Sequence, residues 1–162
     1  MNTPPFIAEY FAAEKLEALL FMAVGLAAIA AAVWLLRTRT TLRGMAGPLV
    51  AVALIQWVVG ATVYFRTDAQ VEQLTQQLSR QPAVFKAEES ARMRTVIDNF
   101  ALYERIEIGL LALGMALVVL LRARPFWFAF GLGLVLQAAF MLALDHFAAA
   151  RAHDYLRVLL AL

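Results

Sequence analysis

Four acidic side chains are spaced as two pairs along this 162-residue sequence. Glu14 and Glu17 are three residues apart, and so are Glu104 and Glu107. On a helix this spacing places both carboxylates of a pair on one face. Carboxylates grouped in this way can bind a cation, hold a metal ion or exchange protons with a substrate. The two pairs are therefore the first candidates for chemistry.

Polar side chains also end two other apolar stretches and could join these carboxylates. Tyr64 and Arg66 close one stretch, and Asp145 and His146 close another. If the apolar stretches form one helical bundle, all these groups meet at the same end of it. The predicted ligand-binding residues are Glu14, Glu17, Tyr64, Arg66, Glu104, Glu107 and Asp145. The predicted metal ligands are Glu17, Glu107, Asp145 and His146.

The ligand types decide which cofactors this cluster could accept. Oxygen-rich ligation favours a divalent ion such as magnesium, calcium, manganese or iron. The sequence has Glu-x-x-Glu twice but lacks the Glu-x-x-His pairs of di-iron bundles. His146 and His153 share one face of one helix, whereas two haem ligands must approach from opposite sides, so haem is not expected. The absence of cysteine excludes disulfides and thiolate metal sites.

The composition identifies the elements that must position these side chains. The sequence is 63% hydrophobic with a mean hydropathy of +0.73, more apolar than a soluble domain of this size can bury. Helices of about 20 apolar residues cross a bilayer, and backbone hydrogen bonding in lipid favours helices here. We expect a single all-α domain, 1–162, forming a four-transmembrane-helix bundle with spans at about 16–36, 48–65, 100–121 and 126–147.

The segment 67–99 between the second and third spans is polar, and its pattern predicts a helical hairpin extension on the non-cytoplasmic side. Apolar residues recur at helical spacing on both sides of a turn at 79–82. This hairpin either closes the bundle or offers a docking surface to a second copy of the chain or to a partner protein. The tail 151–162 either continues the fourth helix or lies in the membrane interface.

The charged residues divide between the two sides of the predicted membrane. All 12 acidic residues lie on one side. The short loops on the other side contain only basic charges, namely Arg37, Arg39, Arg43, Arg122 and Arg124. The positive-inside rule places these loops in the cytoplasm. We therefore expect a multi-pass protein of the bacterial inner membrane with both termini non-cytoplasmic, in which the first span is kept and is not a cleaved signal peptide.

Two glutamines lie near the middle of predicted spans, where an amide is costly unless it is hydrogen-bonded. Gln56 lies in the second span and Gln137 in the fourth. Their predicted depths differ by only about 4–5 Å. We expect the two amides to hydrogen-bond to each other and to hold these helices together.

Three functions fit this arrangement. The preferred one is a small membrane protein with an outward-facing polar pocket that binds or helps to move a small ligand, lipid or ion. One alternative is a membrane-embedded metal-dependent enzyme, and another is a structural or accessory subunit. A purely structural rim, in which Arg66, Arg105 and Lys15 neutralise the acids, competes with all three. The lipid bilayer is the expected partner, and the short basic loops do not indicate nucleic acid binding.

Overall fold

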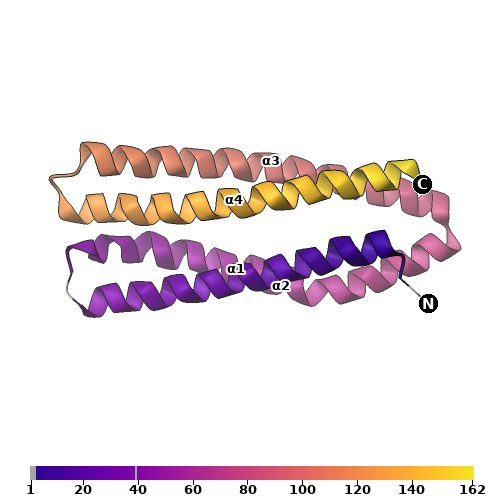
Figure 1. Ribbon diagram of the computed structural model, residues 1–162, viewed down its shortest axis with the longest axis horizontal. Helices are drawn as coiled ribbons and strands as arrows, with labels where there is room; N and C mark the ends of the chain where they lie inside the picture. Colours follow the sequence, from indigo (N-terminus) through magenta and orange to yellow (C-terminus); the bar gives the residue numbers. More distant parts are fainter. Residues whose placement is uncertain (1–2, 39) are drawn as a thin grey trace.

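The structure of the chain, a computed structural model, describes residues 3–38 and 40–162 (Figure 1). This part of the chain is entirely helical and contains no strand. Its elements are α1 (Pro5–Arg37), the short 3-10 helix η1 (Thr41–Met45), α2 (Ala46–Arg80), α3 (Pro82–Leu120) and α4 (Pro125–Ala161). Arg39, which the sequence places in a cytoplasmic loop, lies outside the described residues.

Proline fixes where three of the long helices begin. Pro5, Pro82 and Pro125 each lie in the first turn of a helix, where the missing N–H would have no intrahelical partner anyway. Only Gln81 separates α2 from α3. The helices therefore start where the local chemistry favours a start, and the connection between α2 and α3 is very short.

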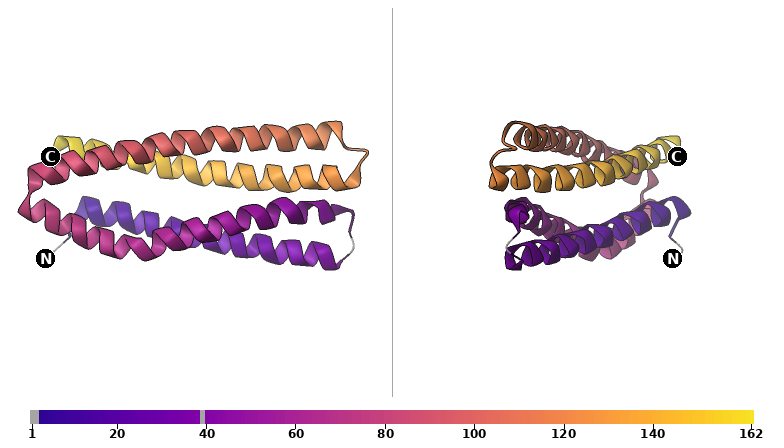
Figure 2. Two further views of the ribbon diagram at one scale, coloured as in Figure 1. Left: turned by 180° about the vertical axis from the view of Figure 1, so that it is seen from behind. Right: turned by 60° about the vertical axis from the view of Figure 1, so that its left-hand side comes forward.

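The four long helices form two antiparallel hairpins, α1 with α2 and α3 with α4, which lie against each other as two layers (Figure 2). Both short loops, around 38–45 and 121–124, lie at one end of the molecule, and both termini lie at the other end with Gln81 (Figure 1). We call the part of each helix nearer the short loops the apolar half and the part nearer the termini the polar half.

The helices are longer than a membrane crossing requires. They contain 33 to 39 residues, which corresponds to about 50–58 Å at 1.5 Å per residue, whereas the hydrocarbon layer is ~30 Å thick. The predicted outer hairpin 67–99 is therefore not a separate unit, because it consists of unbroken continuations of α2 and α3. The tail 151–162 continues α4 as a helix to Ala161.

Three helical segments are long and apolar enough to cross a membrane: Pro5–Arg37, Thr41–Arg80 and Pro125–Ala161. They contain three of the four predicted spans. The remaining predicted span, 100–121, lies in α3 and includes Glu104, Arg105 and Glu107 near its start. These charges interrupt the apolar character of α3, which is not among the three segments.

Small residues pack the apolar half. Ala28 and Ala32 of α1 meet Ala46 and Ala53 of α2 in a buried cluster. Between α3 and α4 the backbones approach closely, because a Cβ added at Gly131 would lie 2.8 Å from the carbonyl oxygen of Gly114. Such close contact replaces the hydrophobic effect as the main source of helix association in lipid.

Large side chains pack the polar half, and all four helices contribute to its core. The buried members of this core are Ile7, Phe11, Leu74, Phe85, Met93, Ala152, Tyr155 and Leu159. The apolar stripe of the predicted outer hairpin is thus covered by the first turns of α1 and the last turns of α4. A partner that binds the hairpin would have to use its outer surface.

The expected hydrogen bond between the two glutamines is not formed, so that prediction is wrong. Gln137 instead donates from Nε2 to the carbonyl oxygen of Leu49 at 3.5 Å. The Gln56 side chain is fully buried, and its amide has no hydrogen-bond partner within the described residues. Similar depth along two helices did not ensure that the two side chains point toward each other.

Replacing Phe85 with alanine should test the core of the polar half. Phe85 is fully buried, so the truncation should lower the free energy of unfolding by about 3–5 kcal/mol. The neighbouring Val84 is exposed, and Val84→Ala should change that free energy by no more than about 0.5 kcal/mol. Denaturant unfolding of the detergent-solubilised protein measures both. Equal losses in the two variants would show that this core does not form.

Replacing Gln56 with methionine should not destabilise the protein. Methionine removes an unpartnered buried amide while keeping an unbranched side chain, so stability should stay constant or rise by about 1 kcal/mol. Gln137→Met should cost less than about 1 kcal/mol because its hydrogen bond is long. The two effects should add within about 0.5 kcal/mol in a double-mutant cycle of unfolding. A coupling energy well above that value would show that the two glutamines interact directly.

Candidate functional site

A partly open cavity of about 300 Å³ lies where the apolar half meets the polar half, and all four long helices line it. Phe21, Val63 and Phe100 supply apolar walls. The polar side chains of its lining are Glu14, Glu17, Arg66, Asn99, Tyr103 and Asp145. The cavity combines an apolar interior with a few polar groups, which is the usual composition of a small-molecule site.

Four of the seven predicted ligand-binding residues line this cavity: Glu14, Glu17, Arg66 and Asp145. Glu14 and Glu17 lie where the apolar stretch of α1 begins. Arg66 lies where that of α2 ends, and Asp145 lies where that of α4 ends. The antiparallel arrangement brings these ends to the same level, as the sequence led us to expect. Whether they bind a ligand stays a prediction.

The remaining predicted residues lie outside the cavity lining. Tyr64 packs against Lys15, whose Nζ is 4.7 Å from the ring centre. Glu104 of α3 is partly exposed and pairs with Nδ1 of His146 at 3.5 Å. The His146 side chain is largely exposed. These three residues therefore form part of the outer surface of the bundle.

Arginines neutralise two of the cavity's carboxylates. Arg66 pairs with Glu14 at 3.4 Å, and Arg151 of α4 pairs with Glu17 of α1. Lys15 pairs with Asp68 at 2.7 Å just outside. An ion-paired rim is thus present in part, although Arg105 forms no ion pair within the described residues.

Glu107 and Asp145 differ from Glu14 and Glu17 because no arginine pairs with them within the described residues. Their exposed fractions are 3% and 7%, and their carboxyl groups are close neighbours. Neither forms an ion pair within the part of the chain that the structure describes, and no nitrogen or hydroxyl donor there bonds to Glu107, so its polar contact is the Asp145 carboxyl group. Asp145 lines the cavity, and Glu107 lies next to Asp145 outside the lining. The cavity wall therefore carries acidity that the protein itself does not compensate.

A third buried acid, Glu89 in α3, was not predicted from the sequence. Its carboxylate is 2% exposed and accepts hydrogen bonds from Arg92 at 2.6 and 2.7 Å and from the Tyr155 hydroxyl at 3.2 Å. Glu89 lies four residues from both Phe85 and Met93, so an acid within that apolar stripe was the available signal. This fully paired network stabilises the polar half and leaves no group free to bind a ligand.

Tyr155, the hydroxyl donor of this network, is buried. It lies in the polar half, beyond the predicted end of the fourth span at 147. Burial, and then the neighbouring Glu89 carboxylate, raise the pKa of its phenol well above the ordinary value. The hydroxyl therefore remains a hydrogen-bond donor across the physiological range.

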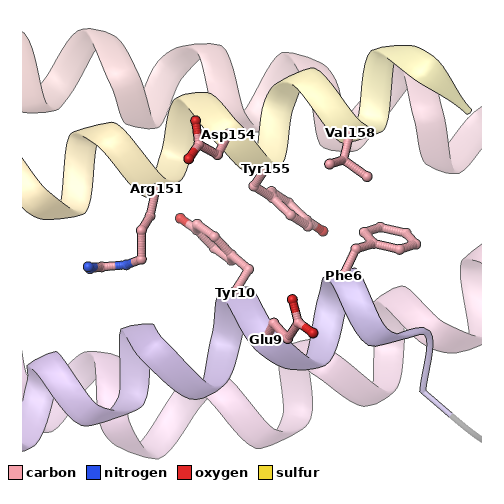
Figure 3. A pocket seen from close by; sticks show the side chains of 7 residues that line it. All are labelled: Phe6, Glu9, Tyr10, Arg151, Asp154, Tyr155 and Val158. Carbon is pink, nitrogen blue, oxygen red and sulfur yellow. The ribbon is translucent and has the colours of Figure 1, made fainter.

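A smaller hollow of about 220 Å³ lies between the first turns of α1 and the last turns of α4 (Figure 3). Tyr10 and Tyr155 stack across it with ring centres 4.4 Å apart. Two of its three charged groups are already engaged, since Arg151 pairs with Glu17 and Asp154 with Arg157, and the third, Glu9, is exposed. We interpret this hollow as a packing seam between two helices, in contrast to the larger cavity.

The predicted metal ligands are not assembled as a metal ion would require. Glu17 is occupied by Arg151, and His146 pairs with Glu104 on the outer surface. Within residues 3–38 and 40–162, no three histidine, aspartate or glutamate side chains lie in a group that could hold a metal ion. The geometry therefore favours a ligand that needs only the carboxyl pair.

Comparison with known proteins assigns no family to the chain. No family model, no curated protein and no solved structure matches it.

Proposed function

We propose that this chain is a small protein of the bacterial inner membrane that binds a small ligand in the cavity between its four helices. The cavity would open toward the non-cytoplasmic side, where both termini lie. The main support is the buried Asp145 in the cavity wall, which has apolar side chains around it and no cation beside it. A rim built only for stability would pair this acid or replace it.

Four crossings of the membrane are part of the proposal. The part of α3 that the sequence assigns to the third span presents large apolar side chains to the surroundings, including Leu113, Met115 and Val119. Glu107 is hidden from them beside Asp145. A bilayer in contact with α3 would thus meet an apolar surface, although the helix also contains charges.

The arginines support the orientation. The two short loops at one end of the bundle carry Arg37, Arg43, Arg122 and Arg124. Short basic loops remain in the cytoplasm. The cavity lies toward the opposite end, so a ligand would enter from the periplasmic side of the membrane.

The other two functions have less support. A metal-dependent enzyme lacks a ligand set among the described residues. For an accessory subunit, the apolar stripe of α2 and α3 was the proposed docking surface, and Leu74, Phe85 and Met93 are instead buried against α1 and α4. The cavity remains the feature that packing alone does not explain.

Cysteine labelling should establish the orientation. The sequence has no cysteine, so single variants give an unambiguous signal. A membrane-impermeant maleimide added to intact cells with a permeabilised outer membrane should label Gln81→Cys but not Thr40→Cys. Thr40→Cys should react only after the inner membrane is opened, and the unmodified protein should never react. The opposite pattern would place the cavity on the cytoplasmic side.

Filling the cavity should remove its ligand without harming the fold. Ala148 lines the cavity on α4, whereas Ala143 on the same helix is exposed and lies outside the lining. Native mass spectrometry of protein purified from its membranes should detect a bound small molecule in the wild type and in Ala143→Phe. Ala148→Phe should lose it at unchanged or higher melting temperature, because the new ring occupies existing space. Equal occupancy in both variants would refute the site.

A further inference from the structure

The charges around the cavity indicate which ligand it accepts, given the proposed function on which this inference rests. Glu14 is neutralised by Arg66, and Glu17 by Arg151. Glu104, which lies near Asp145 and Glu107, pairs with His146. Among the described residues, Asp145 and its neighbour Glu107 are therefore the acids of this site that have no basic partner. The net charge offered to a ligand is therefore negative.

These two acids are too buried to rely on water for compensation. Asp145 is 7% exposed and lines the cavity, and the neighbouring Glu107 is 3% exposed. No nitrogen or hydroxyl donor among the described residues bonds to Glu107. A buried carboxylate without a partner is strongly unfavourable, and a cation placed beside it removes most of that penalty.

We infer that the cavity binds an alkylammonium group, a monovalent organic cation attached to a short apolar body, with its charge against Asp145 in the cavity wall. The ammonium donates hydrogen bonds to Asp145, and its charge also offsets that of the neighbouring Glu107. The apolar body fits the space walled by Phe21, Val63 and Phe100. Free amines and amine-bearing lipid headgroups share this chemistry.

Other ligand classes fit the cavity less well. A divalent metal ion needs several oxygen ligands, but most of the lining is apolar and only two carboxyl groups are uncommitted. An anion would have to rely on Arg66, which is half exposed and already pairs with Glu14. A neutral amphiphile would leave the two acids without a counter-charge.

Matched eight-carbon probes isolate the effect of charge. The full chain in neutral detergent would be titrated with octylammonium, octanol and octanoate while thermal unfolding is followed. Octylammonium should raise the melting temperature in a saturable manner, and the other two should not. Asp145→Asn should weaken octylammonium binding by ~30-fold or more, whereas Asp98→Asn, the same change at an exposed acid of α3 outside the cavity lining, should leave it unchanged.

The variants also have a readout that does not depend on the probe. Asp145→Asn and Glu107→Gln remove uncompensated buried charge while keeping side-chain shape, so each should be at least as stable as the wild type without ligand. Both should lose octylammonium stabilisation. If either variant is clearly less stable yet still binds octylammonium like the wild type, the two carboxyls serve the fold and the inference is overturned.

Two further comparisons distinguish a lipid headgroup from a free amine, and failure of the ammonium inference from failure of the proposed function. Lysophosphatidylethanolamine binding that Asp145→Asn abolishes would support a lipid headgroup, and octylammonium binding without it would support a free amine. Octanol or octanoate acting as strongly as octylammonium would overturn the ammonium inference alone. The ammonium inference alone would also be overturned if none of the probes stabilised the protein while Ala148→Phe still displaced a native ligand. No bound molecule and no stabilisation would overturn both proposals.

Discussion

The structure depends on one constraint: each long helix continues without a break from an apolar surface to a polar one. Backbone N–H and C=O groups have no water to bond to in lipid, so the chain cannot change direction there. The helices turn only at their ends, at the two short loops and at Gln81. The differences in packing between the two halves must therefore come from the side chains. The same four helices pack through small residues in the apolar half and through large residues in the polar half.

The cavity lies where these regimes meet. In the apolar half, residues such as Gly114 and Gly131 bring helices close together. In the polar half, Phe11, Phe85 and Tyr155 fill a wider core. Continuous helices can change their separation only gradually. At the border between the two halves, the small residues no longer hold the helices in contact, and the large side chains of the polar half do not yet fill the space between them. Charged side chains end the apolar stretches at that same level, which explains why the cavity is both apolar and acidic.

The sequence predicted the number of helices and most of the cavity's charged residues for clear physical reasons. Hydrophobic runs are long, prolines mark the helix starts, and Glu17, Arg66 and Asp145 each end a run. Hydropathy reports only the apolar part of a helix, so the continuations through the polar half had to be predicted from helical spacing and from Pro82, and the course of the tail 151–162 was left open. It also does not fix how a helix is rotated about its axis. The Arg151–Glu17 pair and the separation of Gln56 from Gln137 both depend on that rotation.

The uneven apolar character of the helices has a consequence for biogenesis. In the proposed four-span arrangement, α3 is the one long helix that does not qualify as a membrane span by itself, and its buried Glu107 finds its neighbour Asp145 only in α4. The loop between these helices, 121–124, is very short. Release of α3 into lipid before α4 has emerged from the ribosome would expose its charges to hydrocarbon. The insertion machinery would therefore have to retain α3 until α4 arrives and admit the two together as a helical hairpin.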